Sequence, residues 1–427
     1  MKKIILVYGI LITVTTSFAQ GLKLDPAKYK SAEQYVAPKE SGFSAASLPA
    51  KVSYRQYCPK PNYQGDVSTC VGWAAAYGAL STQLNIQMGI TNYMHKWARA
   101  FDPNFIYSFI KQENDQWCQN GTSLANALAV LEQYGCKPMV WDPWLKCNEH
   151  TKTFDEFTLQ LASQYKIEDW KAVANDDIVT NTKMALYYKL PVLVGVYLTE
   201  SFMKGTALGN GVWSPQAGEK MLGGHAMCVI GYDNNKNGGS FEVMNSYGED
   251  YGDKGFVWIP YKDFANLVGE AYFMKTTTYG TGNCSFGDCI STYSRFKFNN
   301  GDIYEGVIKN SELDIYGSML YSNGSFYVGG WNKGRKNGWG ILYDVPSSKF
   351  YNTFYKNDVL VEYSEKAFGF AQAESDKKVK ENLNQLVKSL PEKDKPVSDF
   401  ETVQKALSKY EAPDKPISVK QETKKGK

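Results

Sequence analysis

A thiol, an imidazole and two carboxamides follow one another along this chain of 427 residues in an order that suits nucleophilic chemistry. In chain order they are Gln64, Cys70, His225 and Asn245. A cysteine activated by a histidine attacks carbonyl carbon, while amide groups orient the imidazole or stabilise the oxyanion that forms. These residue types and their order therefore predict cysteine-dependent acyl transfer.

Cys70 is the predicted nucleophile. A free thiol has a pKa of about 8.5 and is mostly protonated at neutral pH, so the reactive thiolate needs electrostatic help. Cys70 opens an Ala-rich run that reaches Met88 and predicts a buried helix. The positive end of a helix and a neighbouring imidazolium both stabilise a thiolate, and Cys70 is placed for both.

His225 is the predicted general acid and base. The chain has three histidines, and the others lie in a Trp-rich stretch (His95) and in a charged segment (His150). His225 instead follows two glycines and precedes a strand-like apolar run. Asn245, on the next predicted strand, can accept the imidazole N–H and fix its tautomer. Taken singly, each has a plainer interpretation, as a buried structural histidine and as a turn-capping asparagine.

Two hydrogen-bond donors are expected for the oxyanion. One is the backbone N–H of Cys70, and the other is the side-chain amide of Gln64, six residues earlier. Losing one such donor costs about 10²–10³ in turnover. Gln64 alone would be an ordinary surface residue, and only its spacing to Cys70 singles it out. No metal ion and no cofactor is expected.

The elements that must position these residues change from helices to strands along the chain. Helices are predicted over 70–88, 123–134 and 175–189, and strands over 192–197, 226–232, 241–244 and 255–259. Helices first and strands second predict an α+β domain with a helical lobe and an antiparallel β lobe. The segment 233–239 is interpreted as a hairpin turn, because a calcium loop would need a carboxylate at Met244.

Together these positions resemble the papain-type cysteine peptidases, over roughly Leu48 to Lys275. The resemblance implies a two-lobed papain-like fold that hydrolyses peptide bonds through a Cys70 thioester. The run Asn120-Gly121-Thr122-Ser123 resembles the family's glycine-bearing wall, which pairs with extended substrate backbone. The implied substrate-binding residues are Asn120, Gly121, Gly224 and Ala226.

The chain also departs from the family's pattern. Thr69 and Val71 flank the cysteine where the family has a small residue and an aromatic one. Tyr247 replaces the tryptophan that shields the histidine–asparagine bond, so a wetter bond is expected. The segment before Leu48 is shorter than the family's helical inhibitory propeptide, so activation of the usual autocatalytic kind is not expected.

Two alternatives to a peptidase stay open. One is an inactive papain-like fold that acts as a peptide-binding or scaffold protein through its C-terminal repeats, an alternative motivated by the three departures. The other keeps the chemistry but passes the thioester to an amine, as a transpeptidase. The sequence does not define the substrate's side-chain preference, nor endopeptidase versus exopeptidase action.

An aromatic and glycine pattern recurs in the C-terminal part of the chain. Asn300-Gly301, Tyr304-Glu305-Gly306 and Tyr316-Gly317 return 23 positions later as Asn323-Gly324, Tyr327-Val328-Gly329 and Trp339-Gly340. Phe350 and Phe354 indicate a decayed third copy. Such a period predicts stacked β-hairpins, a small all-β module. The motif resembles the membrane occupation and recognition nexus (MORN) repeat, which implies contact with a protein or a lipid partner.

The two ends of the chain differ from its middle. A charged start, an apolar run to Val14 and the triplet Ser17-Phe18-Ala19 predict a signal peptide that is removed after Ala19. Export to the periplasm or the extracellular space follows, with no transmembrane segment afterwards. The predicted segments are a signal peptide (1–19), an extended arm (20–50), the peptidase domain (51–278), a linker (279–291), the repeats (292–360) and a charged, mostly disordered tail (361–427).

Composition agrees with an exported enzyme. A net charge of +3 gives no argument for a nucleic-acid partner, and eight cysteines fit an oxidising compartment. Cys284 and Cys289 are predicted to close a tight loop, while Cys228 is expected to be a buried free thiol. Two further bridges are expected among Cys58, Cys118, Cys136 and Cys147, with no connectivity assigned.

Overall fold

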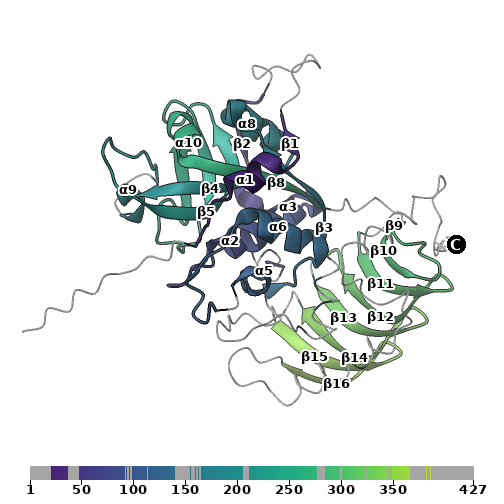
Figure 1. Ribbon diagram of the computed structural model, residues 1–427. Coiled ribbons are helices and arrows are strands. Elements are labelled where there is room, and N and C mark those ends of the chain that lie inside the picture. The colour runs from purple at the N-terminus through teal and green to yellow at the C-terminus, as the bar shows by residue number, and fades with distance from the viewer. Residues whose placement is uncertain are drawn as a thin grey trace, which may run out of the picture.

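The structure is a computed structural model, and it has two bodies (Figure 1). It describes residues 21–36, 48–139 except 92, 94, 95, 97, 98 and 113, then 154, 159, 162, 165–204, 211–276, 284–365 except 299, 300, 324, 345, 346 and 348, and finally 381 and 385. The expected signal peptide, His95, His150, Cys147 and nearly all of the expected tail lie outside these residues. Within the described residues, no helix is both long and apolar enough to cross a membrane.

A long buried helix begins at Cys70, as predicted. It consists of α2 (Cys70–Gly72), η3 (Trp73–Leu80) and α3 (Ser81–Met88), and η3 has the wider π-type hydrogen bonding. Small side chains let this helix pack on all sides, and Ala75 and Ala76 are fully buried. Gly89 ends it in the left-handed conformation.

Two shorter helices complete the helical lobe, α5 (Pro103–Ile110) and α6 (Leu124–Gln133). Asp102 and Ser123 cap their first turns with side-chain oxygens. Gly135 follows α6 with a φ of +75°, so the predicted helix and its glycine stop are confirmed.

The β lobe is one sheet in the strand order β1-β3-β8-β4-β5-β6-β7, with β2 added beside β5. Among the described strand pairs of this sheet, β1–β3 is the parallel one, and the others are antiparallel. The strands are β1 (Gln34–Tyr35), β2 (Lys51–Ser53), β3 (Ile167–Val173), β4 (Val192–Thr199), β5 (Met221–Asp233), β6 (Ser240–Met244), β7 (Phe256–Pro260) and β8 (Val268–Thr276). The short helices around it are α1 (Pro26–Ser31), η2 (Arg55–Tyr57), η5 (Asn175–Asp177), α8 (Ile178–Tyr187), α9 (Glu200–Met203) and α10 (Tyr261–Leu267).

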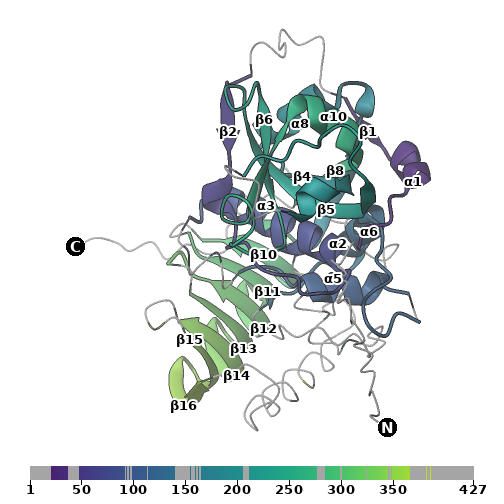
Figure 2. The ribbon, with the colours of Figure 1, turned by 90° about the vertical axis from the view of Figure 1, so that its left-hand side faces the viewer.

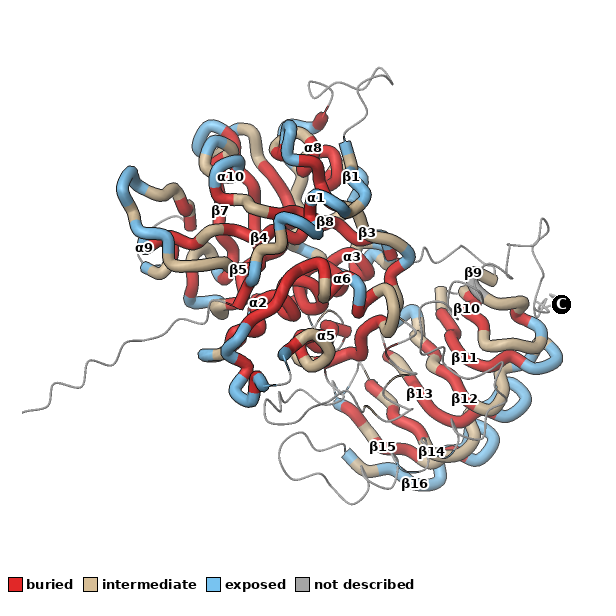
Figure 3. Tube along the Cα trace, in the orientation of Figure 1, coloured by how far each residue is buried: buried red, intermediate tan, exposed pale blue. Residues whose placement is uncertain are grey.

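The sheet separates two apolar cores. On one face α8 and α10 pack on Val194, Val196 and Val229, and on the other the helix that begins at Cys70 packs on Ala226 and Cys228. Buried backbone therefore runs through the middle of this body (Figure 3). The α+β class and the four predicted strands are confirmed, whereas β1, β2, β3 and β8 were not predicted.

The turn between β5 and β6 is a hairpin, as predicted. Asn237, Gly238 and Gly239 all have positive φ, which suits the αL-tolerant residue types there. Asp233 accepts the backbone N–H of Asn235 and pairs with Lys51 at 3.2 Å.

The C-terminal body is a separate eight-stranded antiparallel sheet in sequential order. Its strands are β9 (Cys284–Phe286), β10 (Tyr293–Lys297), β11 (Ile303–Lys309), β12 (Glu312–Leu320), β13 (Phe326–Asn332), β14 (Arg335–Asp344), β15 (Lys349–Lys356) and β16 (Val359–Glu365). In both ribbon views it lies beside the helical lobe and away from α8 and α10 (Figures 1 and 2). β9 falls in the segment that the sequence assigned to a linker, and β16 extends into the expected tail.

The 23-residue period corresponds to one hairpin per repeat. Gly306 faces Gly317 across the first hairpin, and Gly329 faces Gly340 across the second. The ring of a buried tyrosine lies over each glycine pair, because a Cβ on Gly317 would lie 2.3 Å from the Tyr304 hydroxyl oxygen. Glycine is therefore needed where the tyrosine ring crosses the sheet.

The cysteines differ in part from the prediction. The Cys284–Cys289 disulfide forms, and Cys228 is a buried free thiol. Cys58 and Cys136 are also free and buried, so the expectation of two bridges among the four remaining cysteines is wrong. Both thiols are enclosed by apolar packing in the core that contains the Cys70 helix. Cys118 is disulfide-bonded.

Candidate active site

Cys70 lies at the first turn of its helix, at the junction of the two lobes. The thiol is fully buried, and the backbone N–H of Ala226, on β5, hydrogen-bonds toward its sulfur. Burial raises the thiol pKa to about 11, although this N–H and those of Gly21, Val71 and Cys70 itself lower it. The described state therefore holds a neutral thiol.

His225 and Asn245 form a buried pair on neighbouring strands. Nε2 of His225 lies 2.8 Å from Oδ1 of Asn245. An amide oxygen only accepts, so Nε2 carries the proton and Nδ1 is left as the basic nitrogen. Nδ1 is buried and has no hydrogen-bond partner among the described residues. Burial lowers the imidazole pKa to about 4, against a smaller raising effect of Asn245.

The histidine–asparagine bond is dry, contrary to the expectation from Tyr247. His225 is fully buried and Asn245 is 3 % exposed. The Tyr247 ring packs on the imidazole with centroids 4.9 Å apart, and Phe202 lies at 5.8 Å. These two rings exclude water from the bond in place of the family's tryptophan.

Gln64 is held beside the same strands. Its backbone N–H donates to the Ser246 carbonyl, and its Oε1 accepts the Ser246 hydroxyl at 2.6 Å. Nε2 donates to the Val67 carbonyl at 2.8 Å, which occupies one of its two hydrogens. The loop to Cys70 is fixed further by the Ser68 N–H, which donates to the Cys118 carbonyl. The four predicted residues therefore surround one junction between the lobes.

The N-terminal segment, expected to be an extended arm, lies in the cleft between the lobes. We call residues 21–36 the N-terminal strap. Leu22 forms a parallel bridge with Thr122 of the helical lobe and an antiparallel bridge with Gly224 of the β lobe. The Leu22 N–H donates to the Gly224 carbonyl at 3.3 Å, and Lys23 N–H to the Thr122 carbonyl at 2.8 Å.

The remainder of the strap anchors it to the β lobe. The Tyr29 ring of α1 is buried and packs edge-on against Tyr272, and its hydroxyl donates to the Val173 carbonyl. β1 then adds to the edge of β3. In Figure 2, α1 lies at the side of the sheet close to the ends of β4 and β8. The strap is thus an integral part of the fold.

The predicted substrate-binding wall contacts the strap at some positions and not at others. The Gly121 and Gly224 backbones face it so closely that a Cβ on either would meet strap backbone within 2.6 Å. Ala226 packs in the same core as Leu22. The Asn120 side chain instead points to Gln112, with Nδ2 3.3 Å from Oε1. Thr122, which the sequence did not single out, supplies the pairing groups.

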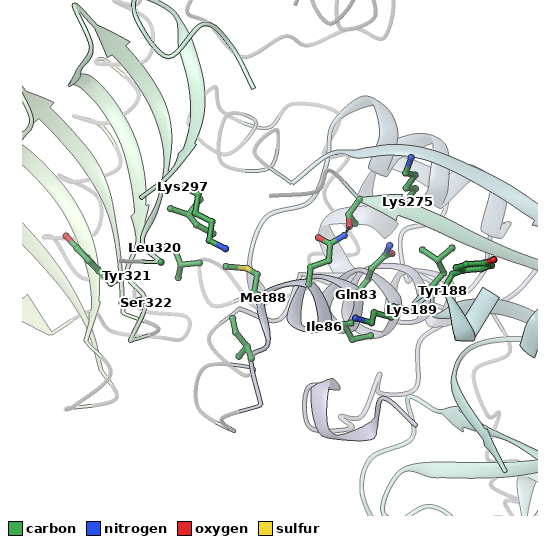
Figure 4. Close-up of a pocket in the computed structure, with 16 residues that line it drawn as sticks. Gln83, Ile86, Met88, Tyr188, Lys189, Lys275, Lys297, Leu320, Tyr321 and Ser322 are labelled. Carbon is green, nitrogen blue, oxygen red and sulfur yellow. Dashed lines mark hydrogen bonds between the residues drawn. The ribbon is translucent and has the colours of Figure 1, made fainter. Parts of the chain in front are cut away.

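A cavity also lies away from the candidate catalytic residues. A hollow of about 670 Å³ opens between α3 and the hairpin sheet (Figure 4), and its lining includes Met88, Lys189 and Lys297. None of the four candidate catalytic residues lines it.

Comparison with known proteins identifies the family. A model of the papain family cysteine proteases matches residues 49–274, which is more than half of the chain. The chain therefore belongs to the papain family of cysteine proteases. The match covers both lobes and stops before the hairpin sheet.

Individual relatives are distant. A peptidase C1-like protein of Acanthamoeba polyphaga mimivirus is 24 % identical over 220 residues, which span 50 % of this chain and 69 % of that protein. The cathepsin B-like cysteine proteinase 3 of Caenorhabditis elegans is 30 % identical over 137 residues, or 30 % of this chain and 35 % of that one. Among solved structures, xylellain, a cysteine protease from Xylella fastidiosa, is 22 % identical with a TM-score of 0.49, covering 61 % of this chain and 96 % of its own.

Proposed function

We propose that this chain is an exported, thiol-dependent peptidase. The Cys70 sulfur attacks the carbonyl carbon of a peptide bond, and the resulting thioester is hydrolysed by water. The observation that carries the proposal is the buried His225–Asn245 pair, because its hydrogen bond leaves Nδ1 of His225 as the basic nitrogen. The backbone N–H of Ala226, the residue after His225, hydrogen-bonds toward the Cys70 sulfur.

Each group has a defined role in the proposed reaction. Nδ1 of His225 takes the thiol proton of Cys70 and returns it to the leaving amine, while Asn245 holds the ring by its other nitrogen. Proton transfer of this kind contributes about 10²–10⁴ to the rate. The second Nε2 hydrogen of Gln64 and the Cys70 N–H stabilise the oxyanion. Deacylation reverses the proton path, with water in place of the amine.

The strap makes the described state latent. It covers the wall formed by Thr122 and Gly224, and the N–H of Gly21 hydrogen-bonds toward the sulfur. The strap therefore covers the site, and activity requires its displacement.

One observation favours an inactive scaffold as the second candidate. The thiol pKa of about 11 and the imidazole pKa of about 4 describe a neutral pair rather than an ion pair. Burial is the largest cause of both shifts, and the strap contributes to that burial. Displacing the strap distinguishes the peptidase from the inactive scaffold, because the Cys70 thiol of a scaffold would stay unreactive after the strap is removed.

The test is hydrolysis of peptide-methylcoumarin substrates by the full chain and by a Gly21→Ala variant that unseats the strap. We expect turnover and labelling of Cys70 by an epoxysuccinyl inhibitor, greater in the variant than in the parent chain. Cys70→Ala in either background should abolish both. Equal activity with and without the thiol would exclude the proposal. N-terminal sequencing of the exported protein should separately find Gln20 as its first residue.

The hairpin sheet is proposed to contact a protein partner, in keeping with its resemblance to MORN repeats. Its last strand, β16, exposes Val359, Val361 and Tyr363, each at least 60 % accessible. An edge strand with apolar side chains offers both unpaired backbone and apolar contact area. Loss of a captured partner in Val361→Lys, but not in Lys356→Glu on β15, would support this surface. Binding to anionic vesicles instead would indicate the lipid alternative.

A further inference from the structure

The cavity between the peptidase domain and the hairpin sheet takes no part in the proposed reaction. Its volume is about 670 Å³, and ligand cavities in proteins usually measure about 300–1,000 Å³. One wall is α3, the last part of the helix that begins at Cys70, and the hairpin sheet forms the wall opposite (Figure 4). The cavity therefore has the size of a ligand site and lies at the far end of the helix from the candidate nucleophile.

The hairpin sheet contributes a row of three side chains. Lys297 of β10 pairs with Ile303 of β11, and Ile303 pairs with Leu320 of β12. Residues directly opposite one another in adjacent strands project to the same face. All three line the cavity, and in Figure 4 Lys297 and Leu320 lie across from Met88 of α3. This wall thus offers two aliphatic side chains beside one ammonium group.

The α3 wall combines aliphatic side chains with a buried carboxamide. Ile86 and Met88 supply the aliphatic surface. Gln83 also lines the cavity, is 2 % exposed, and its Oε1 has no hydrogen-bond partner among the described residues. The side chain of Gln87, in contrast, donates to the Thr276 hydroxyl at 2.6 Å. A buried acceptor without a partner is unfavourable, so a ligand with an N–H or O–H donor would satisfy Gln83.

The charge of the cavity wall is positive. The described lining residues include Lys189, Lys275 and Lys297 and no acidic residue. No described carboxylate forms an ion pair with Lys189 or Lys297. Lys275 lies 3.9 Å from Oε2 of Glu168 on β3, the outer limit of an ion pair. Three ammonium groups around one cavity favour an anionic ligand.

The charge, the aliphatic walls and the unsatisfied acceptor together define the ligand class. Inorganic phosphate would match the lysines but leave the aliphatic side chains uncovered. A fatty acid would cover these side chains, but its carboxylate has no hydrogen to donate to Gln83. A peptide with acidic and aliphatic residues supplies carboxylates, apolar side chains and backbone N–H donors in one chain.

We propose that this cavity binds an acidic peptide segment, at a site separate from the catalytic cleft. Its carboxylates pair with Lys189 and Lys297, a backbone N–H donates to Oε1 of Gln83, and its aliphatic side chains cover Met88 and Leu320. Hydrogen bonds between charged partners are stronger than those between neutral ones. The inference goes beyond the proposed peptidase function and does not depend on it, because binding here requires no turnover.

The test measures binding of acetyl-Asp-Leu-Asp-Leu-Asp-amide by calorimetry. Matched peptides carry asparagine or lysine in place of aspartate, and decanoate represents the fatty-acid alternative. The protein is the full chain with Cys70→Ala, so that no peptide is cleaved. Lys297→Met in this background removes the charge and keeps most of the side-chain length. Lys309→Met, at the exposed opposite end of β11 from Ile303, is the matched control.

We expect the aspartate peptide to bind at least about tenfold more tightly than the asparagine peptide at low ionic strength, and the lysine peptide to bind most weakly. Lys297→Met should weaken the aspartate peptide by about tenfold, and Lys309→Met should leave it unchanged. Equal affinities of the aspartate and asparagine peptides, no effect of Lys297→Met, or binding of decanoate without binding of the aspartate peptide would each overturn the site.

Gln83→Met tests the donor contact, with effects of opposite sign on stability and on binding. The substitution removes the buried unsatisfied acceptor and keeps a side chain of similar length, so the midpoint of thermal unfolding of the free protein should rise. Affinity for the aspartate peptide should fall by about tenfold, because the backbone N–H loses its acceptor. A lower unfolding midpoint with wild-type affinity would show that Gln83 is purely structural and would overturn its assigned contact.

Discussion

Nε2 of His225 lies 2.8 Å from Oδ1 of Asn245, and both residues are buried at the junction of the two lobes. This hydrogen bond fixes the orientation of the imidazole ring, so that Nδ1, the other ring nitrogen, points away from Asn245. Because Asn245 offers an acceptor and no charge, it fixes the tautomer without stabilising an imidazolium as a carboxylate would. The pairing therefore sets ring orientation more than it sets basicity.

Loss of the Asn245 side chain should reduce catalysis without abolishing it. In Asn245→Ala the ring loses its hydrogen-bond partner and can rotate, and misplacement by about 1 Å costs roughly 10²-fold. We expect kcat/KM for peptide-methylcoumarin substrates to fall by about this factor. Asn266→Ala, on the exposed side of α10, is the matched control. An Asn245→Ala variant with wild-type kcat/KM would remove Asn245 from the proposed mechanism.

Unseating the strap should expose the thiol. A Cβ on Gly21 would lie 2.1 Å from the Ser68 carbonyl oxygen, so Gly21→Ala forces the strap backbone away from the cleft. The rate of Cys70 alkylation by iodoacetamide should rise, and its pH midpoint should fall below the value of about 11 for the covered thiol. Lys23→Ala, at an exposed strap side chain, should change neither. Equal alkylation rates in Gly21→Ala and wild type would show that the strap does not protect the thiol.

Strap docking should weaken as pH rises toward neutrality. With the strap docked, burial first and the Asp25 charge second raise the pKa of Glu270 to about 7, from the value of about 4.3 for a solvated glutamate. Docking therefore takes up a proton: its full strength is present below about pH 4.3 and is lost as the pH rises through 7. A shift of this size corresponds to docking weakened on the order of 10²-fold.

This pH dependence is measured as the ratio of Cys70 alkylation rates in wild type and Glu270→Gln between pH 4 and 8. The comparison cancels the ionisation of the thiol itself, because both proteins carry the same cysteine. We expect the ratio to rise across this window, since only the wild type loses docking strength there. A ratio that stays flat would mean that Glu270 ionisation is not coupled to the strap.

A methyl group at Gly317 should disrupt the hairpin sheet. Its Cβ would lie within 2.6 Å of three atoms of the Tyr304 side chain, which is fully buried and cannot retreat. Overpacking of this kind costs about 1–3 kcal/mol. We expect Gly317→Ala to lower the midpoint of thermal unfolding and to speed limited proteolysis of the sheet. Ser318→Ala, one residue further on the same strand, serves as control and should remain close to wild type.

The local elements were largely predictable because their signals are contiguous. The Ala-rich run after Cys70 could only form a buried helix, and Ser123 with Gly135 marked both ends of α6. Two of the strands that were missed, β3 and β8, carry charged residues such as Glu168 and Glu270 within them. Their membership of the sheet depends on partners far away in sequence, which a local pattern does not reveal.

The sequence by itself determined the residue types available for chemistry, their order, and the 23-residue period that becomes one hairpin per repeat. Only the tertiary structure decided that residues 21–24 lie in the cleft, that Thr122 pairs with them, and that the Asp25 N–H donates to Glu270. The physical reason is that these relationships are backbone pairings and side-chain contacts between segments separated by 100 residues or more. They come into existence when the two lobes assemble, and no short stretch of sequence encodes them.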